Sequence, residues 1–187
     1  MTAETPFLTD IKTIRSRARH HIEAGAITAS YGADKETVIR LLNEALATEL
    51  VCVLRYKRHY FMAQGPTSAA IAAEFLEHAK EEEAHADSIA KRIVQLGGEP
   101  DFSPDSLTMR SHAEYVAGNS LLDMIREDLV AERIAIDSYR EMINYLGTHD
   151  STTSRMLQGI LAMEEEHAED LASLIAEYAQ QPALLRT

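Results

Sequence analysis

Four long stretches without proline constrain the fold of this chain more than any other feature. They are residues 35–64, 67–96, 120–146 and 151–179. Along each stretch, apolar residues recur at alternating steps of three and four, the spacing of one face of an α-helix. Each stretch would form a helix about 40–45 Å long. The sequence therefore predicts an all-α protein built as a four-helix bundle.

The lengths of the connections predict how the helices follow one another. Only a few residues join the first helix to the second and the third to the fourth, so each pair should be antiparallel. Residues 97–119 separate the second helix from the third and form one long crossover along the bundle. We expect one bundle domain over residues 34–180. An extension, residues 1–33, precedes it with a short helix at Ile11–Glu23, and residues 181–187 form a short tail.

The charge is strongly acidic and unevenly spread. The net charge is −12, of which the first 25 residues carry +1 and the remainder −13. A body this acidic attracts cations rather than nucleic acid. A basic segment in the extension could still contact DNA phosphates, but a subunit contact or a solvated face is favoured. Its residues are Lys12, Arg15, Arg17, Arg19, His20 and His21.

No targeting signal is visible in the sequence. No apolar run approaches the roughly 18–20 residues of a membrane span, and the first residues lack the basic and hydrophobic parts of a secretory signal. We therefore expect a cytoplasmic location without membrane contact.

Each predicted helix carries a glutamate at its midpoint. The midpoints fall within one residue of Glu49, Glu82, Glu132 and Glu164, so the four carboxylates should meet at one depth of the core. A histidine follows three residues after two of them, at His85 and His167, on the same helix face. With eight histidines in a glutamate-rich chain, two such pairs are close to chance, and their placement carries the argument.

Four buried carboxylates need positive charge, because each would lose several kcal/mol of hydration and repel the others. Two divalent cations neutralise them, and two neutral imidazoles complete the coordination without adding charge. Mixed oxygen and imidazole ligands suit iron or manganese, and zinc less well. The predicted site thus holds two metal ions per subunit, with iron preferred. The alternative is that one or more of these glutamates lies solvated at a helix edge.

Four motifs resemble those of the bacterioferritin branch of the ferritin-like di-iron family. They are the segment 42–49, Glu82-x-x-His85, the segment 128–132 and Glu164-x-x-His167. The resemblance covers about residues 40–180. It implies that Glu82 and Glu164 bridge two irons, that Glu49 and His85 complete one ion, and that Glu132 and His167 complete the other. It also implies a redox-active tyrosine at Tyr56, for which an ordinary core aromatic is an equal alternative.

Three departures from that family refine the expectation. Glu83 stands where bacterioferritins have a haem-binding methionine, which argues against haem. Only residues 180–187 follow the fourth helix, so the fifth helix of 24-subunit shells is missing, and a Dps-like shell of twelve is favoured. A single cysteine, Cys52, excludes the four-cysteine domain that rubrerythrins carry.

The function that follows is a di-iron ferroxidase of iron storage and detoxification. It would oxidise Fe(II) with oxygen or peroxide inside a homo-oligomeric shell. Two alternatives remain open: a Dps-like protein that protects DNA, and a di-metal (Fe or Mn) oxidase or peroxidase that stores no iron.

Overall fold

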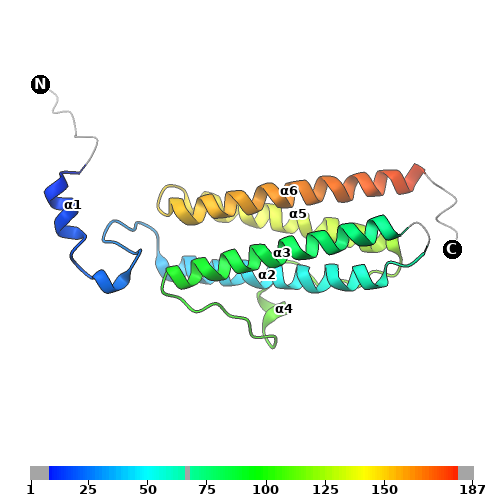
Figure 1. Cartoon of the computed structure of the whole chain (residues 1–187), viewed down its shortest axis with the longest axis horizontal. Coiled ribbons are helices and arrows are strands. Elements are labelled where there is room, and N and C mark those ends of the chain that lie inside the picture. The colour runs from blue at the N-terminus through cyan, green and yellow to red at the C-terminus, as the bar shows by residue number, and fades with distance from the viewer. Residues whose placement is uncertain (1–8, 66–67, 181–187) are drawn as a thin grey trace, which may run out of the picture.

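The computed structural model describes residues 9–65 and 68–180, and every regular element in those ranges is helical. Four long helices lie side by side as a bundle (Figure 1), which confirms the predicted all-α architecture. They are α2 (Lys35–Met62), α3 (Ala69–Gln95), α5 (Leu121–Leu146) and α6 (Ser151–Gln180). No helix in the described ranges combines the length and apolar character that crossing a membrane requires.

Local sequence signals set the ends of these helices. Ser120 precedes α5, and its hydroxyl accepts a hydrogen bond from the Asp123 amide at 3.2 Å, which satisfies a free donor of the first turn. Gly97 and Gly147 follow α3 and α5 with φ of 77° and 47°. Glycine adopts such positive φ values without a steric penalty. The start of the crossover after α3 and the turn between α5 and α6 therefore lie where the sequence predicts.

The core consists of two apolar clusters that lie on opposite sides of the bundle's midpoint. α2 packs against α3, and α5 packs against α6. One cluster contains Leu42, Leu46, Ile89, Ile93 and Leu157, and the other contains Cys52, Phe75, Ile125 and Leu171. The predicted midpoint glutamates fall between the two clusters, so apolar side chains flank that layer toward both ends.

The crossover between α3 and α5 runs along α2 and includes one short helix, α4 (Leu107–Arg110). Side chains of α2 hold its backbone at successive points. The Thr48 hydroxyl accepts a hydrogen bond from the His112 amide at 2.9 Å, and Arg55 Nη1 donates to the Glu114 carbonyl at 2.9 Å. Because the crossover returns the chain to the other end of the bundle, α3 and α5 run parallel, as predicted.

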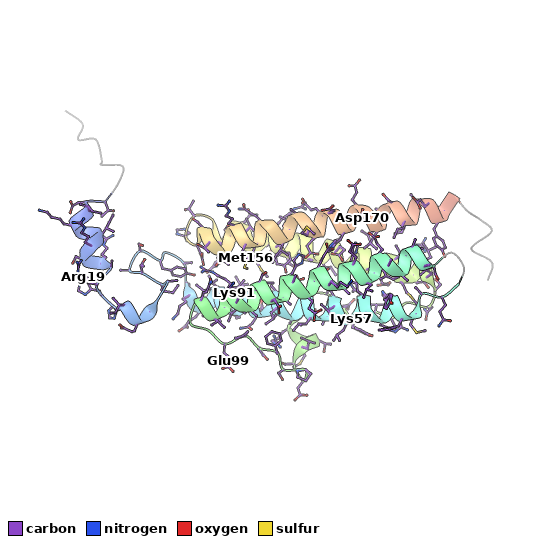
Figure 2. The ribbon with its side chains drawn as sticks, viewed as in Figure 1. Arg19, Lys57, Lys91, Glu99, Met156 and Asp170 are labelled. Carbon is purple, nitrogen blue, oxygen red and sulfur yellow. The ribbon has the colours of Figure 1, made fainter. Side chains whose placement is uncertain are left out.

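Within the described part of the N-terminal extension, the segment with α1 stands away from the bundle, beyond the end where α2 begins (Figure 1), whereas Tyr31 contacts the bundle and donates a hydrogen bond to Asp150 at 2.9 Å. Its helix α1 covers Ile11–Arg17 only, so the predicted helix over Ile11–Glu23 is too long. His21 has a positive φ of 52° and starts the short 3-10 turn η1 (Ile22–Ala24). Arg19 lies in this separate segment (Figure 2). The predicted tail, residues 181–187, lies outside the described residues.

Candidate metal centre

All six residues expected to bind metal meet in the middle of the bundle. α2 supplies Glu49, α3 supplies Glu82 and His85, α5 supplies Glu132, and α6 supplies Glu164 and His167. The exposed fraction is 1% for each glutamate and for His167, and 8% for His85. None of the four carboxylates is therefore solvated at a helix edge, and the alternative that the sequence left open is wrong.

His85 gathers three carboxylate oxygens around one ring nitrogen. Its Nδ1 lies 3.1 Å from Oε2 of Glu82 and 3.1 Å from Oε1 of Glu164. Oε2 of Glu49 lies 3.4 Å away from the same nitrogen. These four atoms form one group of potential ligands.

His167 forms a second group of the same kind. Its Nδ1 lies 3.5 Å from Oε1 of Glu82, 3.8 Å from Oε2 of Glu132 and 3.8 Å from Oε2 of Glu164. Glu82 and Glu164 thus belong to both groups, with one oxygen of each carboxylate in each group. A carboxylate divided in this way is suited to bridging two ions.

Several buried atoms of this layer form no hydrogen bond with any described residue. They are Oε2 of Glu49, Oε1 of Glu82, Oε2 of Glu132, Oε1 of Glu164 and Nδ1 of His167. Leaving buried polar atoms unpaired costs about 1–3 kcal/mol each, and more for charged groups. These four oxygens and Nδ1 of His167, together with Nδ1 of His85, fit two divalent cations, so this buried cluster is consistent with a dinuclear site.

Without metal, protons must balance the charge of the layer. Burial raises the pKa of Glu49 well above its usual value, and repulsion by Glu82 adds to this. Burial also raises the pKa of Glu164, again with repulsion from Glu82. Burial lowers the pKa of His85, but its close contacts with the carboxylates of Glu49 and Glu82 outweigh burial and bring the pKa to about 9. The same competition brings the pKa of His167 to about 11.

Hydrogen bonds from neighbouring side chains orient the cluster. Tyr56 donates to Oε1 of Glu132, and Tyr139 donates to Oε1 of Glu49. Nε2 of His167 lies 2.8 Å from Oε2 of Glu81, to which it can donate while Nδ1 faces the centre. Histidine ligands of metals usually hold their second nitrogen in this way.

Sequence reasoning singled out Tyr56 but missed Tyr139 as a functional residue. Tyr139 follows Glu132 by seven residues on the apolar stripe of α5. This position in the sequence is typical of an ordinary core aromatic. Only the pairing of α5 with α2 shows that its hydroxyl reaches Glu49.

A buried ionic group adjoins the centre. Arg55 Nε donates to Asp128 at 2.8 Å, and Nδ1 of His59 lies 2.8 Å from the other oxygen of Asp128. Burial raises the pKa of Asp128, and His59 and Arg55 act in the opposite direction. Asp128 precedes Glu132 by one helical turn, so this group fixes α5 against α2 beside the cluster.

Glu83, the residue on which the expectation about haem depends, points away from the centre. Its side chain is 59% exposed, and its Oε2 lies 3.5 Å from Nζ of Lys57 on α2.

This fold and buried cluster define a class of protein. Residues 39–180 match the model of the ferritin-like domain, so the chain belongs to the ferritin-like family. Within it, the chain is related to bacterioferritins. The bacterioferritin of Mycobacterium avium is 30% identical over 135 residues, which cover 72% of this chain and 80% of that protein. The bacterioferritin of Desulfovibrio desulfuricans is 28% identical over 134 residues, which cover 71% of this chain and 71% of that protein.

Solved structures agree with this assignment. A dodecameric thioferritin, the bacterioferritin-related protein of Bacteroides fragilis, matches with a TM-score of 0.78 and 30% identity, and the match covers 83% of this chain and 94% of that one. Dps from Thermosynechococcus elongatus has a TM-score of 0.72 at 22% identity, covering 75% and 91%, which shows the shared fold alone.

Proposed function

We propose that this protein is a ferroxidase that oxidises Fe(II) with oxygen or peroxide and thereby stores or detoxifies iron. One observation carries the proposal. Glu82 and Glu164 each direct one oxygen toward Nδ1 of His85 and the other toward Nδ1 of His167. A pair of shared carboxylates places two ions side by side, which is what a reaction that takes one electron from each of two ferrous ions requires.

The side chains have separable roles in this proposal. Glu49 and His85 complete one ion, and Glu132 and His167 complete the other. Four carboxylates balance two divalent ions, and they stabilise the more highly charged ferric product by Coulomb attraction. The two apolar clusters exclude bulk water, which strengthens these interactions. When bound, the two irons supply the electrons that reduce the oxidant.

Substitution of central residues tests the proposal. We expect Glu82→Ala and His167→Ala to abolish rapid Fe(II) oxidation while the circular dichroism spectrum stays helical. The rate is measured by stopped-flow absorbance of the ferric product. Unchanged rates in both variants would overturn the assignment. Glu166→Gln, an exposed neighbour of His167 on α6, is the matched control and should oxidise iron at the wild-type rate.

The identity of the metal needs its own measurement, because oxygen and imidazole ligands accept manganese as well as iron. We expect iron in protein purified without added metal, at about two ions per chain. Elemental analysis counts both metals directly. Manganese at that stoichiometry, together with no ferroxidase activity, would favour the alternative oxidase or peroxidase.

Storage requires a hollow assembly, and we propose a shell of twelve subunits. The support is the similarity to the thioferritin of Bacteroides fragilis, which is described as dodecameric. Light scattering on the full chain distinguishes the proposals. A mass near twelve times 20.8 kDa supports storage, whereas a monomer or dimer supports an enzyme that stores no iron.

A further inference from the structure

A further group of potential ligands lies one turn away from the dinuclear cluster, between α3 and α6. It consists of His78 and Glu74 on α3 and Asp170 on α6, whose ligand atoms all lie within 4.8 Å of one another. The side chains of Glu74 and Asp170 are 35% and 48% exposed, so the group opens to the surface of the bundle. Figure 2 labels Asp170 on α6 and so shows where this group lies on the bundle.

His78 separates this group from an ordinary patch of surface acids. The residue is only 2% exposed, and its Nε2 faces Oε1 of Glu74 at 3.4 Å and Oδ2 of Asp170 at 4.0 Å. Within residues 9–65 and 68–180, no side chain or backbone group forms a hydrogen bond with this nitrogen. A buried imidazole ring therefore directs one of its nitrogens at two carboxylates, with Glu74 at ion-pair distance.

The other nitrogen indicates which form of the ring is present. Nδ1 of His78 lies 3.3 Å from the hydroxyl oxygen of Tyr56. Because that hydroxyl donates its only hydrogen to Glu132, it accepts from His78, and Nδ1 carries the proton. In a neutral ring Nε2 then presents a lone pair. A lone pair directed at two carboxylates forms a donor set that can bind a cation.

We propose that Glu74, His78 and Asp170 bind a third divalent cation, which passes from there to the dinuclear centre. One imidazole and two carboxylates suit Fe(II) or Mn(II), and the two negative charges match one divalent ion. Glu77 and Glu81 lie on the same helix and add to the negative field. Burial raises the pKa of Glu74, and repulsion by Asp170, Glu77 and Glu81 raises it further.

Geometry supplies the path inward. The rings of His78 and His167 stack with centroids 4.0 Å apart. His78, Glu132 and His167 form a further buried group whose ligand atoms lie within 4.8 Å of one another. His78 is thus common to the outer group and to the group with Glu132 and His167, so an ion at Glu74 and Asp170 lies a short distance from the centre. The delivery role rests on the proposed ferroxidase function, whereas the binding of a third ion does not.

Counting ions on the full chain tests the binding. The double variant Glu74→Gln, Asp170→Asn removes two partly exposed carboxylates and leaves buried His78 in place, so folding should be unaffected. Asp87→Asn with Glu169→Gln changes two exposed acids on the same two helices and is the charge-matched control. Equilibrium dialysis against Co(II), followed by elemental analysis, should show one ion fewer per chain in the double variant than in wild type or control.

The outcomes separate this site from the dinuclear centre. If the double variant binds as many Co(II) ions as wild type with the same affinities, the third site is wrong while the centre stands. A protein with both Glu82→Gln and Glu164→Gln should lose two ions and keep one. If the ion that it keeps is the one that the Glu74→Gln, Asp170→Asn variant loses, both sites are supported. If those bridging substitutions remove none, the centre fails independently of the third site.

Kinetics test the delivery. At limiting Fe(II), we expect the double variant to oxidise iron about tenfold more slowly in a single turnover, a change of about 1.4 kcal/mol in the barrier. The final amount of ferric product should be unchanged, because the centre itself is intact. An unchanged rate together with a lost ion would overturn delivery.

Discussion

The hydroxyl of Tyr139 on α5 donates a hydrogen bond to Oε1 of Glu49 on α2, and the bond from Tyr56 on α2 to Glu132 on α5 runs in the opposite direction. Each non-bridging glutamate is therefore held by a tyrosine from the helix opposite. Both hydroxyls keep their protons, since burial raises the pKa of each tyrosine well above its usual value.

Replacing Tyr139 with phenylalanine should loosen Glu49 without changing the shape of the core. An unpaired buried acceptor costs about 1–3 kcal/mol. We therefore expect the melting temperature of the metal-free protein to fall by about 2–12 °C and iron oxidation to slow. Tyr56→Phe should have a similar thermal effect. If Tyr56 is also redox-active, an electron paramagnetic resonance signal of a tyrosyl radical after peroxide treatment should disappear in Tyr56→Phe and persist in Tyr139→Phe.

Replacing Glu164 with glutamine should change stability in opposite directions with and without metal. In the metal-free protein, the substitution removes a carboxyl whose burial and repulsive neighbours are unfavourable. We expect a gain of about 1–3 kcal/mol, or about 2–12 °C in melting temperature. With Fe(II) or Mn(II) under anaerobic conditions, wild type should gain more stability from binding than the variant.

Thermal melts with chelator and with metal give both numbers for Glu164→Gln. Glu166→Gln, two residues further along α6, is exposed and should follow wild type in both conditions. A variant that is destabilised without metal would contradict the idea that carboxyl repulsion strains the metal-free layer.

The pH should act on metal binding and on metal-free stability with opposite signs. His85 has a pKa of about 9 in the folded protein, above the usual value of about 6.5. Its contribution to metal-free stability is thus complete below about pH 6.5 and is lost as the pH rises toward 9. Metal affinity should rise over the same interval, because fewer protons compete for the ligands.

Calorimetric titrations in buffers of different ionisation enthalpy measure the protons released on binding. We expect release of more than about one proton per chain at pH 7, since Glu49, Glu164 and both histidines favour their protonated forms without metal. No release at that pH would contradict the charge balance inferred for the layer.

Replacing Arg55 with methionine should destabilise the bundle strongly. The substitution leaves Asp128 buried without its guanidinium partner and frees the crossover at Glu114. Breaking a buried ion pair costs about 3–5 kcal/mol, so the melting temperature should fall by about 6–20 °C. Lys57→Met removes an exposed pair with Glu83 and should change stability by about 0.5 kcal/mol or less. Equal effects of the two substitutions would show that the Arg55 network contributes no more than a surface pair.

The bundle and its six central residues follow from the sequence because helical periodicity and segment midpoints are local properties. Placing Glu49, Glu82, Glu132 and Glu164 at one depth requires only that the four helices be of similar length. The contacts of Tyr139 and Arg55 depend instead on how α2 faces α5, which no local pattern specifies. His78 on α3 and Asp170 on α6 are likewise far apart in the sequence, and only the fold brings them together.

The apolar clusters on either side of the polar layer determine how small species can reach it. Each contributing glutamate lies about 20 Å from both ends of its helix. Leu46 and Ile89 pack on one side of the layer and Phe75 and Leu171 on the other, all buried. Travel along the bundle axis is closed in both directions. In the proposed ferroxidase, metal, oxidant and protons would therefore cross between neighbouring helices, so substitutions in the lateral wall should alter exchange far more than equally large ones at the bundle's two ends.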